Sequence, residues 1–252
     1  MARVGFVGTG EIASAMVQGL AGQGHQIIVS DRNADRARHL AATLEGVSVA
    51  PNAEVVAGSD IVVLCLLAKV AGQVLAELPF RADQSVISAM VDVPMKKLRV
   101  LCAPATDIAI TIPLPPIAKG GCPLPVFPDS AALHSLFGSK NPVFAVKDEA
   151  ALDAHFGATA LCSPLLAQMI VTANWLASHT GDAEKAEAYV SKVIRAYLPE
   201  RPEAGQLAAD LYSLSTEGGL NATLRAAMSP ALPMLEQGLI GFHSRLGLSN
   251  TP

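Results

Sequence analysis

The chain has 252 residues, of which 51% are apolar and 16% charged, so it can build a hydrophobic core and is not disordered. The formal net charge is −4, and only 4% of the residues are aromatic. This composition excludes the clustered basic and stacking surfaces of a nucleic-acid-binding protein. The length fits two small domains, because domains usually have about 100–150 residues.

Cysteine and histidine spacing gives no sign of a metal site. Cys65, Cys102, Cys122 and Cys162 form no CxxC pair, and no two of the six histidines are four residues apart. The cysteines lie in apolar stretches, which is typical of reduced, buried thiols. A strand pattern begins at residue 3, with no basic region and long apolar stretch before it, so we expect a cytoplasmic protein.

Residues 156–178 carry no charged side chain and in this respect resemble a membrane-spanning segment. They contain many polar side chains, including Gln168, Thr172 and Asn174, which a lipid-facing helix would not normally carry. We therefore expect no contact with a membrane. The segment predicts a helix that is buried within the protein or in a subunit interface.

The first 90 residues alternate between strand and helix patterns. Residues 3–7 form a short apolar strand pattern, and apolar residues at positions 12, 13, 16, 17 and 20 then mark one face of a helix. Residues 60–67 are almost continuously apolar, as in a central strand of a parallel sheet. The repeated order with short connections predicts a doubly wound parallel α/β sheet. Further strands are expected at residues 26–30, 47–49 and 85–88, and further helices at 31–44, 53–58 and 71–78.

The pattern changes twice after residue 100. Residues 100–127 are rich in proline, which cannot donate in a strand ladder, so we expect extended strands and loops that close the far edge of the sheet. From residue 148 onward the sequence has helix patterns throughout. We therefore predict an α/β domain at residues 1–150 and an all-α domain at residues 151–252. Helices are expected at residues 183–198, from residues 201–203 onward, and at 220–246 with a break at Ser229 and Pro230.

A glycine motif joins the first strand to the first helix. Gly8, Gly10 and Ala13 follow the spacing GxGxxA. Gly8 permits the tight turn, Gly10 lets the backbone approach a diphosphate, and Ala13 allows close contact between helix and strand. The helix N-terminus offers unpaired N–H groups to the phosphates. This order of strand, turn and helix predicts that residues 1–150 are a Rossmann domain that binds a dinucleotide.

The end of the second strand bears on which dinucleotide binds. Asp31 suits the ribose hydroxyl groups of NAD. Ser30, Arg32 and Asn33 instead offer a hydroxyl, a guanidinium and an amide to the 2′-phosphate of NADP. We favour NADP, and NAD stays open as the alternative.

Several segments resemble the pyrroline-5-carboxylate reductase family. Residues 5–15 (GFVGTGEIASA) are similar to the family's opening motif, and residues 59–64 (SDIVVL) to its strand before the cofactor loop. Ser88 lies where the family's buried strand carries Ser, and residues 216–221 (TEGGLN) resemble its Ser-Pro-Gly-Gly-Thr-Thr loop at the substrate site. The resemblance implies an NADPH-dependent oxidoreductase of proline biosynthesis, which reduces a cyclic imine acid, pyrroline-5-carboxylate or a close analogue. It also implies cofactor contacts at Gly8, Thr9, Gly10, Glu11, Ile12 and Ala13.

Two segments depart from the family pattern. The family's Val-Lys-Pro corresponds to residues 66–68 (Leu-Leu-Ala), and Lys69 lies two positions after the expected lysine. The family's Met-Pro-Asn-Thr-Pro corresponds to residues 112–116 (Ile-Pro-Leu-Pro-Pro), so Leu114 replaces the amide that would contact nicotinamide and substrate. An altered substrate is therefore an alternative. By position, the resemblance still implies cofactor contacts at Leu66, Leu67 and Pro113.

The loop that resembles the family's substrate loop supplies the expected substrate contacts. Gly218 and Gly219 at a helix start can offer backbone N–H groups to a carboxylate. Thr216 can add a hydroxyl group, and Asn221 stands where the family's Thr donates to the imine nitrogen. Glu217 is a proton donor, a ligand for a substrate amine, or a partner of the helix dipole. We predict Asn221, Thr216 and Glu217 as catalytic residues and Gly218, Gly219 and Leu220 as substrate-binding residues.

Two other function classes stay open. An NAD(P)-dependent hydroxy- or keto-acid dehydrogenase usually relies on a lysine near the start of the second domain. Residues 153–182 contain no Lys or Arg, which disfavours this class. A non-catalytic dinucleotide-binding protein is the other alternative, because the family's Lys and Asn positions are lost.

Apolar side chains on the uncharged helix predict a second copy of the chain as a partner. Met169, Ile170, Val171, Trp175 and Leu176 form a nearly continuous apolar surface. A domain of about 100 residues has too little interior to bury it alone. We therefore predict a homodimer through the C-terminal helices, with the active site near the interface.

Overall fold

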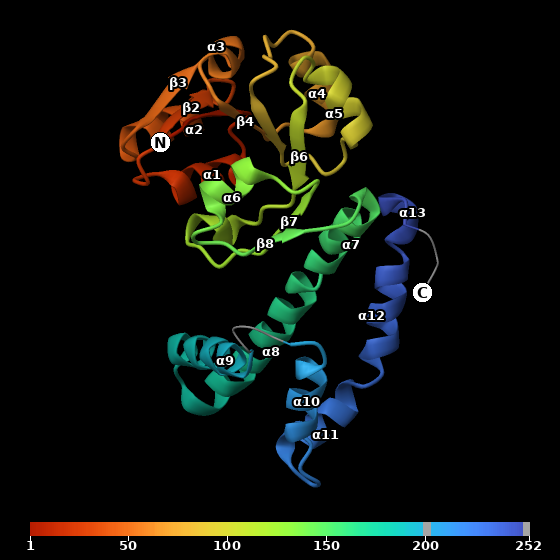
Figure 1. Cartoon of the computed structure of the whole chain (residues 1–252). Coiled ribbons are helices and arrows are strands. Elements are labelled where there is room, and N and C mark those ends of the chain that lie inside the picture. The colour runs from red at the N-terminus through yellow and green to blue at the C-terminus, as the bar shows by residue number, and fades with distance from the viewer. Residues whose placement is uncertain (199–202, 249–252) are drawn as a thin grey trace. The chain divides into compact units, whose positions relative to one another are not determined.

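A computed structural model describes residues 1–198 and 203–248 of the chain. The chain divides into two compact units, Met1–Phe156 and Gly157–Pro252 (Figure 1). The division lies within α7 (Glu149–Thr159), whereas the sequence pattern places it near residue 150. Among the described residues, all strands belong to the first unit, called here the sheet unit, and the second is the helical unit.

The described part of the sheet unit contains an eight-stranded sheet in the order β3-β2-β1-β4-β5-β6-β7-β8. Neighbouring strands are parallel except β6 and β7, which are antiparallel. This confirms the predicted doubly wound α/β sheet. The strands are β1 (Arg3–Val7), β2 (Gln26–Ser30), β3 (Val47–Ala50), β4 (Ile61–Leu64), β5 (Ser85–Ser88), β6 (Asp107–Thr111), β7 (Leu124–Phe127) and β8 (Val143–Ala145).

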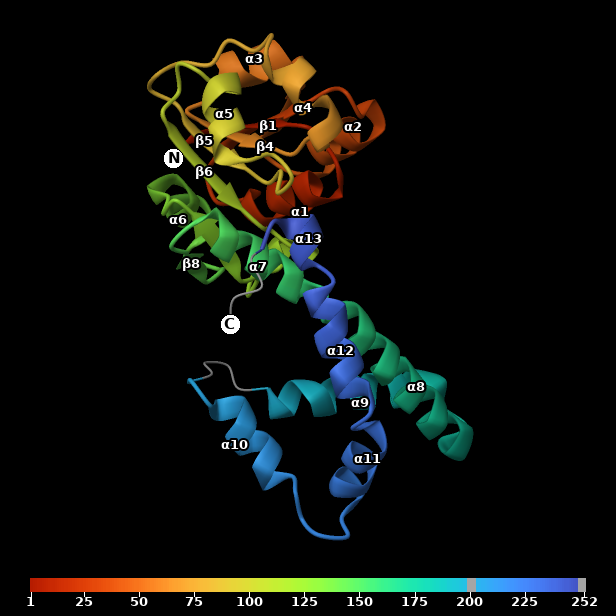
Figure 2. The same cartoon turned by 90° about the vertical axis from the view of Figure 1, so that its right-hand side faces the viewer.

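Helices cover both faces of this sheet. They are α1 (Glu11–Leu20), α2 (Ala34–Thr43), α3 (Asn52–Ala57), α4 (Ala68–Leu75), α5 (Met95–Leu101) and α6 (Ala131–Phe137). Because side chains alternate along a strand, Ile61 and Val63 of β4 join the core with α1, α2 and α6, whereas Val62 and Leu64 join the core with α3, α4 and α5. Figure 2 shows α3 and α5 on one side of the strands and α1 on the other. Burial on both faces explains the apolar sequence of β4.

Local differences from the sequence-based expectations affect the site. β4 ends at Leu64, so residues 65–67 form a loop beyond the strand instead of its last positions. Residues 100–127 do hold β6, a 3₁₀ turn (Pro115–Ala118) and β7, but the far edge strand is β8. The sequence pattern does not indicate α5, α6 or β8, because such short elements have too few periodic positions to stand out.

The helical unit has helices throughout its described residues, as predicted. They are α8 (Cys162–Thr180), α9 (Ala183–Tyr197), α10 (Gln206–Ser213), α11 (Leu220–Met228), α12 (Ala231–Ile240) and α13 (His243–Leu246). Asp182 caps α9, because its carboxylate accepts a hydrogen bond from the Lys185 backbone N–H at 3.0 Å. The predicted break at Ser229 and Pro230 is confirmed between α11 and α12. The helix start expected at residues 201–203 falls largely on residues outside the described ones.

Few side chains in the described part of the helical unit are buried. They are Ala173 in α8 and Ala186 and Val190 in α9, and α10 to α13 contribute none. Glu149–Thr180 is long and apolar enough to cross a membrane by length and composition, and 6% of its most apolar window is buried. Of the two explanations expected for this segment, burial within one chain is therefore wrong, because its apolar side chains face outward. The subunit interface stays a prediction.

Candidate functional site

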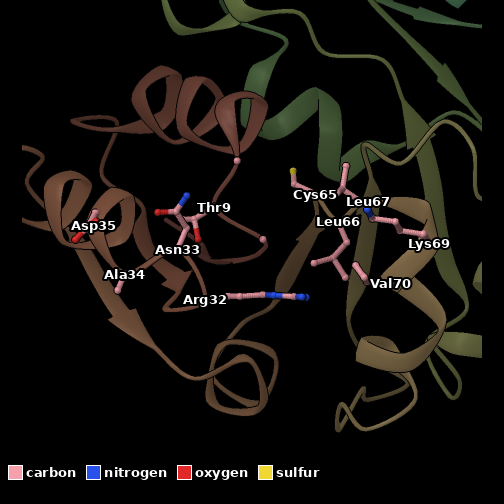
Figure 3. Close-up of a pocket in the computed structure, with 12 residues that line it drawn as sticks. Thr9, Arg32, Asn33, Ala34, Asp35, Cys65, Leu66, Leu67, Lys69 and Val70 are labelled. Carbon is pink, nitrogen blue, oxygen red and sulfur yellow. The ribbon is translucent and has the colours of Figure 1, made fainter.

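A cavity of about 700 Å³ lies where β1, β2 and β4 end. Loops after these three strands form its wall (Figure 3). The chain crosses from β1 to β2 on one side and β4 lies on the other, so the cavity is at the point where the strand order reverses. Ligands of open α/β sheets bind at this position. The lining residues are Gly8, Thr9, Gly10, Arg32, Asn33, Ala34, Asp35, Cys65, Leu66, Leu67, Lys69 and Val70.

The turn after β1 is held by buried hydrogen bonds. Gly8 has a φ of +99°, and a Cβ there would lie 2.4 Å from the carbonyl oxygen of Cys65. Only glycine combines this conformation with this close approach. The Gly8 N–H donates to Ser30 Oγ at 2.9 Å, and Thr9 Oγ1 donates to the Ser30 carbonyl at 2.7 Å. These bonds tie the turn to the end of β2.

Ser30 therefore differs from the prediction that it contacts a 2′-phosphate. Its side chain is fully buried and does not line the cavity, and its Oγ accepts the Gly8 hydrogen bond. Ser30 positions the glycine turn instead of touching a ligand. Thr9 is also buried, with its hydroxyl group engaged in the same network, so only its backbone can serve a ligand.

Gly10 has a different reason to be glycine. Its φ is −76°, which any residue adopts, and a Cβ there would meet no protein atom within 4 Å. Gly10 is the N-cap of α1 and makes no side-chain cap, so the first N–H groups of the helix lack intrahelical partners. Protein packing does not require glycine here, whereas close approach of a diphosphate does. The cradle fits the diphosphate of a dinucleotide.

The other residues of the opening motif lie outside the cavity. Glu11 is exposed, Ile12 is partly buried against the core, and Ala13 is fully buried, as close contact between helix and strand requires. Their side chains do not line the cavity, so any contact from them to a ligand comes from the backbone. Pro113 is buried and also lies outside the lining.

The loop after β2 places Arg32 and Asn33 on the cavity wall and leaves Asp31 off it. Asn33 caps α2, because its Oδ1 accepts a hydrogen bond from the Arg36 N–H at 3.3 Å. This leaves the Asn33 NH₂ group for a ligand. Asp31 is exposed, and its backbone N–H donates to Ala50. The geometry thus places Arg32 and Asn33, and not Asp31, at the cavity.

A second hollow of about 360 Å³ adjoins the first, and Arg32 lines both. Asn52 Oδ1, at the start of α3, is buried and has no hydrogen-bond partner among the described residues. A buried acceptor without a partner is costly, so Asn52 is an unusual residue in the wall of this hollow. Asn52 is not among the residues predicted from the sequence, although its place two residues after the end of β3 was a signal. The remaining lining residues are Ala53, Val70, Gln73, Val74, Glu77 and Leu78.

The loop after β4 forms the opposite wall. Leu66 and Leu67 line the cavity, and their cofactor contacts, which the resemblance implies, stay a prediction. Burial raises the pKa of the Cys65 thiol to about 12, so this cysteine is not a nucleophile near neutral pH. Lys69 and Val70 of α4 complete the wall, and neither was predicted from the sequence as a contact residue. Among the described residues, no cluster of three or more His, Cys, Asp or Glu side chains is placed to hold a metal ion.

The predicted substrate residues form one turn before α11, in the helical unit. Gly218 has a φ of +71°, and Gly219 is the N-cap. The Gly219 N–H donates to the Thr216 carbonyl at 3.0 Å, so it is not free to bind a carboxylate. This corrects the prediction for Gly219. The side chains of Thr216, Glu217, Leu220 and Asn221 are exposed.

Comparisons with known proteins agree with this geometry. Residues 3–92 match the family described as NADP oxidoreductase, coenzyme F420-dependent. A pyrroline-5-carboxylate reductase from Coxiella burnetii matches with a TM-score of 0.79 at 19% identity, over 99% of each chain. The chain has the fold of the pyrroline-5-carboxylate reductases. The resemblance inferred from the sequence is thus confirmed as a likeness of fold, and no curated protein matches the chain by sequence.

Two further structures extend the comparison. The Plasmodium falciparum pyrroline carboxylate reductase, solved with NADP bound, has a TM-score of 0.75 at 16% identity, over 97% of this chain and 95% of that one. A reductive aminase from Aspergillus terreus, solved with NADPH and ethyl-5-oxohexanoate, has a TM-score of 0.60 at 19% identity, over 99% and 89%. Both share the two-part architecture of a sheet followed by helices with this chain.

Proposed function

We propose that the chain is an NADPH-dependent reductase of carbon–nitrogen double bonds, acting on pyrroline-5-carboxylate or a close cyclic analogue. The observation that carries this proposal is the cradle at Gly10. A Cβ there meets no protein atom within 4 Å, at a helix start that faces a cavity of about 700 Å³. The likeness of fold to reductases solved with NADP or NADPH supports the choice of cofactor.

Different residues of the sheet unit would bind different groups of the cofactor. The open first turn of α1 would bind the diphosphate. The guanidinium of Arg32 and the amide of Asn33 would bind the 2′-phosphate, since both line the cavity. The second hollow, which Arg32 also lines, would take the adenine. When bound, the reduced nicotinamide supplies a hydride to the substrate carbon.

Residues of the turn before α11 would bind the substrate. Asn221 would donate from its NH₂ group to the imine nitrogen, which makes the neighbouring carbon a better hydride acceptor. The Thr216 hydroxyl and the Gly218 N–H would bind the carboxylate. Glu217 would hold the proton that the nitrogen acquires, or would complement the dipole of α11. The exposure of these groups leaves them open to a ligand.

We further propose that two copies associate through the helical unit. Trp175 and Val171 of α8 are 62% and 69% exposed, and residues 156–178 contain no charge that would oppose burial. Leaving such large apolar side chains in water costs about 25 cal/mol per Å². A second copy offers a surface of the same chemistry. Sedimentation at micromolar concentration tests this, and a monomer would contradict it.

The test of the catalytic proposal is NADPH oxidation with pyrroline-5-carboxylate, followed by a panel of cyclic imines, keto acids and ketone–amine mixtures. We expect turnover with a cyclic imine acid. The Asn221→Ala variant should lose about 10²-fold in kcat, the order found for one donor to a reacting group, while the Kd for NADPH stays unchanged. Ser213→Ala, an exposed change in α10, is the matched control. Binding of NADPH without turnover of any substrate would favour the non-catalytic alternative.

A further inference from the structure

Two cations line the 700 Å³ cavity without an ion-pair partner. Arg32 comes from the loop after β2 and Lys69 from the first turn of α4. The cavity's carboxylate, Asp35, is engaged with Arg38 at 2.6 Å. Among the described residues, the ion pairs include neither Arg32 nor Lys69. The cavity therefore has an excess of positive charge on its wall, which a multiply charged anion would neutralise.

The two cations belong to different parts of the cavity. Arg32 also lines the adjoining hollow beside Asn52, whereas Lys69 does not. Figure 3 shows the Arg32 side chain reaching into the space from one wall, and Lys69 on the opposite wall beside Leu67. The loop that precedes Lys69 contacts the glycine turn, because the Cys65 carbonyl lies against Gly8. Lys69 is thus on the side of the diphosphate cradle, and Arg32 on the side of the adenosine hollow.

No group on α4 competes for the Lys69 ammonium. The N-cap of this helix is Leu67, which makes no side-chain cap, and the first turn contains no acidic residue. The side chain is exposed at the rim, so its charge is available. Leu67 stands at the position where the pyrroline-5-carboxylate reductase pattern has a lysine. Its side chain carries no charge. Lys69 is therefore the ammonium that this wall presents to an anion.

We infer that Lys69 binds the cofactor's diphosphate while Arg32 binds its 2′-phosphate, so that one cation sets affinity and the other sets the preference for NADP. The inference rests on the proposed dinucleotide cofactor. Its physical basis is that a diphosphate is common to NADPH and NADH, whereas the 2′-phosphate occurs in NADPH alone. A cation at the first group must act on both cofactors, and a cation at the second must act on one.

The experiment compares dissociation constants of the full chain for NADPH, NADH and adenosine 2′-monophosphate, measured by calorimetry. We expect Lys69→Gln to weaken the binding of NADPH and of NADH by the same factor, about tenfold. The dissociation constant for adenosine 2′-monophosphate should not change. Arg32→Gln should weaken the binding of NADPH and of adenosine 2′-monophosphate and leave the binding of NADH unchanged. Lys97→Gln, at an exposed lysine of α5 outside the cavity, is the matched control.

Each outcome decides a separate point. The role of Lys69 would be overturned if Lys69→Gln lost affinity for NADPH but not for NADH. It would also be overturned if the dissociation constants of Lys69→Gln equalled those of Lys97→Gln. In both cases the proposed function stands. Restored affinity for both cofactors in Lys69→Arg would support a charge contact. An unaltered chain that binds neither cofactor would overturn the proposed function itself, and the inference with it.

Discussion

The sheet unit and the helical unit differ in how completely each buries its apolar side chains. In the sheet unit, Phe6 and Val63 are fully buried, and helices cover both faces of the strands. In the helical unit, Trp175 of α8 is 62% exposed and Leu220 of α11 is 89% exposed. One unit completes its own core within a single chain, whereas the other presents its apolar side chains outward. This difference is the basis for the proposed association of two copies through the helical unit.

The same difference divides the proposed site. The cofactor cavity is built from three loops of the sheet unit, whose strands and buried hydrogen bonds hold it in place. The proposed substrate residues lie on an exposed turn of the helical unit. We therefore expect cofactor binding to tolerate loss of subunit association and catalysis to depend on it.

The largest expected effect is on the free energy of unfolding, and it differs between a core residue of the sheet unit and an apolar residue of the helical unit. Phe6→Ala should lower the free energy of unfolding by about 3–5 kcal/mol, because it removes a fully buried ring and leaves a cavity. Trp175→Ala should change the unfolding of the isolated chain little but weaken the dimer, because its ring is exposed in one chain. Urea unfolding and sedimentation measure the two quantities. If both variants lost the same free energy of unfolding at protein concentrations too low for two copies to associate, the proposed difference between the two units would be wrong.

The next effect concerns the thiols. Desolvation raises the pKa of the partly buried Cys65 and the buried Cys102 to about 12, and it also raises the pKa of the buried Cys122, whereas Cys162 of the helical unit is exposed. Thiols with such pKa values stay protonated at pH 8, so we expect them to react with a disulfide reagent at least about a hundredfold more slowly than after unfolding.

The Cys162→Ser variant isolates this prediction. It should show no fast reaction in the folded state and three reactive thiols in urea, whereas the unaltered chain retains Cys162. A fast thiol in the folded variant would show that the interior of the sheet unit is less protected than its burial indicates.

A smaller effect separates the two glycines of the turn. Gly8→Ala should lower stability by about 1–3 kcal/mol, because φ is +99° and the new Cβ would lie 2.4 Å from a carbonyl oxygen. Gly10→Ala should cost less than about 1 kcal/mol, since its Cβ would enter open space. Its NADPH affinity should nevertheless fall about tenfold, because the methyl group occupies the place of the diphosphate. Unchanged affinity in Gly10→Ala would remove the main support for the cofactor site.

The sequence predicts the sheet unit better than the helical unit, for a physical reason. A parallel strand buried on both faces, such as β4, has an apolar run that periodicity detects, and Gly8 and Gly10 mark a turn whose geometry few other residues permit. The positions of Leu66 and Leu67 at the cavity followed from the resemblance. Periodicity also gave the helices of the second unit, but it does not tell which face a partner covers.

Other site features depend on contacts that no local pattern specifies. Ser30 looked like a phosphate ligand, but a hydrogen bond from Gly8, 22 residues away, buries its hydroxyl group. Asn52 lines the second hollow, and its Oδ1 is buried without a hydrogen-bond partner among the described residues. The Gly219 N–H proved to be engaged within its own turn. The Ser30 and Asn52 findings depend on the tertiary arrangement, and the Gly219 finding depends on the exact geometry of one turn, which the residue types alone do not specify.

The smallest expected effect concerns an exposed ion pair that joins β1 to the start of β4. Arg3 donates to Asp60 at 2.5 and 3.1 Å, and this hydrogen bonding lowers the pKa of the Asp60 carboxyl. A carboxyl with a lowered pKa stabilises the fold above its unfolded pKa, near 4, and loses this contribution as the pH falls through the lower folded pKa. Both side chains are about half exposed, so solvent and salt screen the attraction. Asp60→Asn should therefore lower the unfolding midpoint of the sheet unit slightly at pH 7, with a difference that shrinks as the pH falls below the ordinary carboxyl pKa and also shrinks in 1 M salt. A difference that grew toward acidic pH would mean that the carboxyl is destabilising in its charged form, contrary to its contact with Arg3.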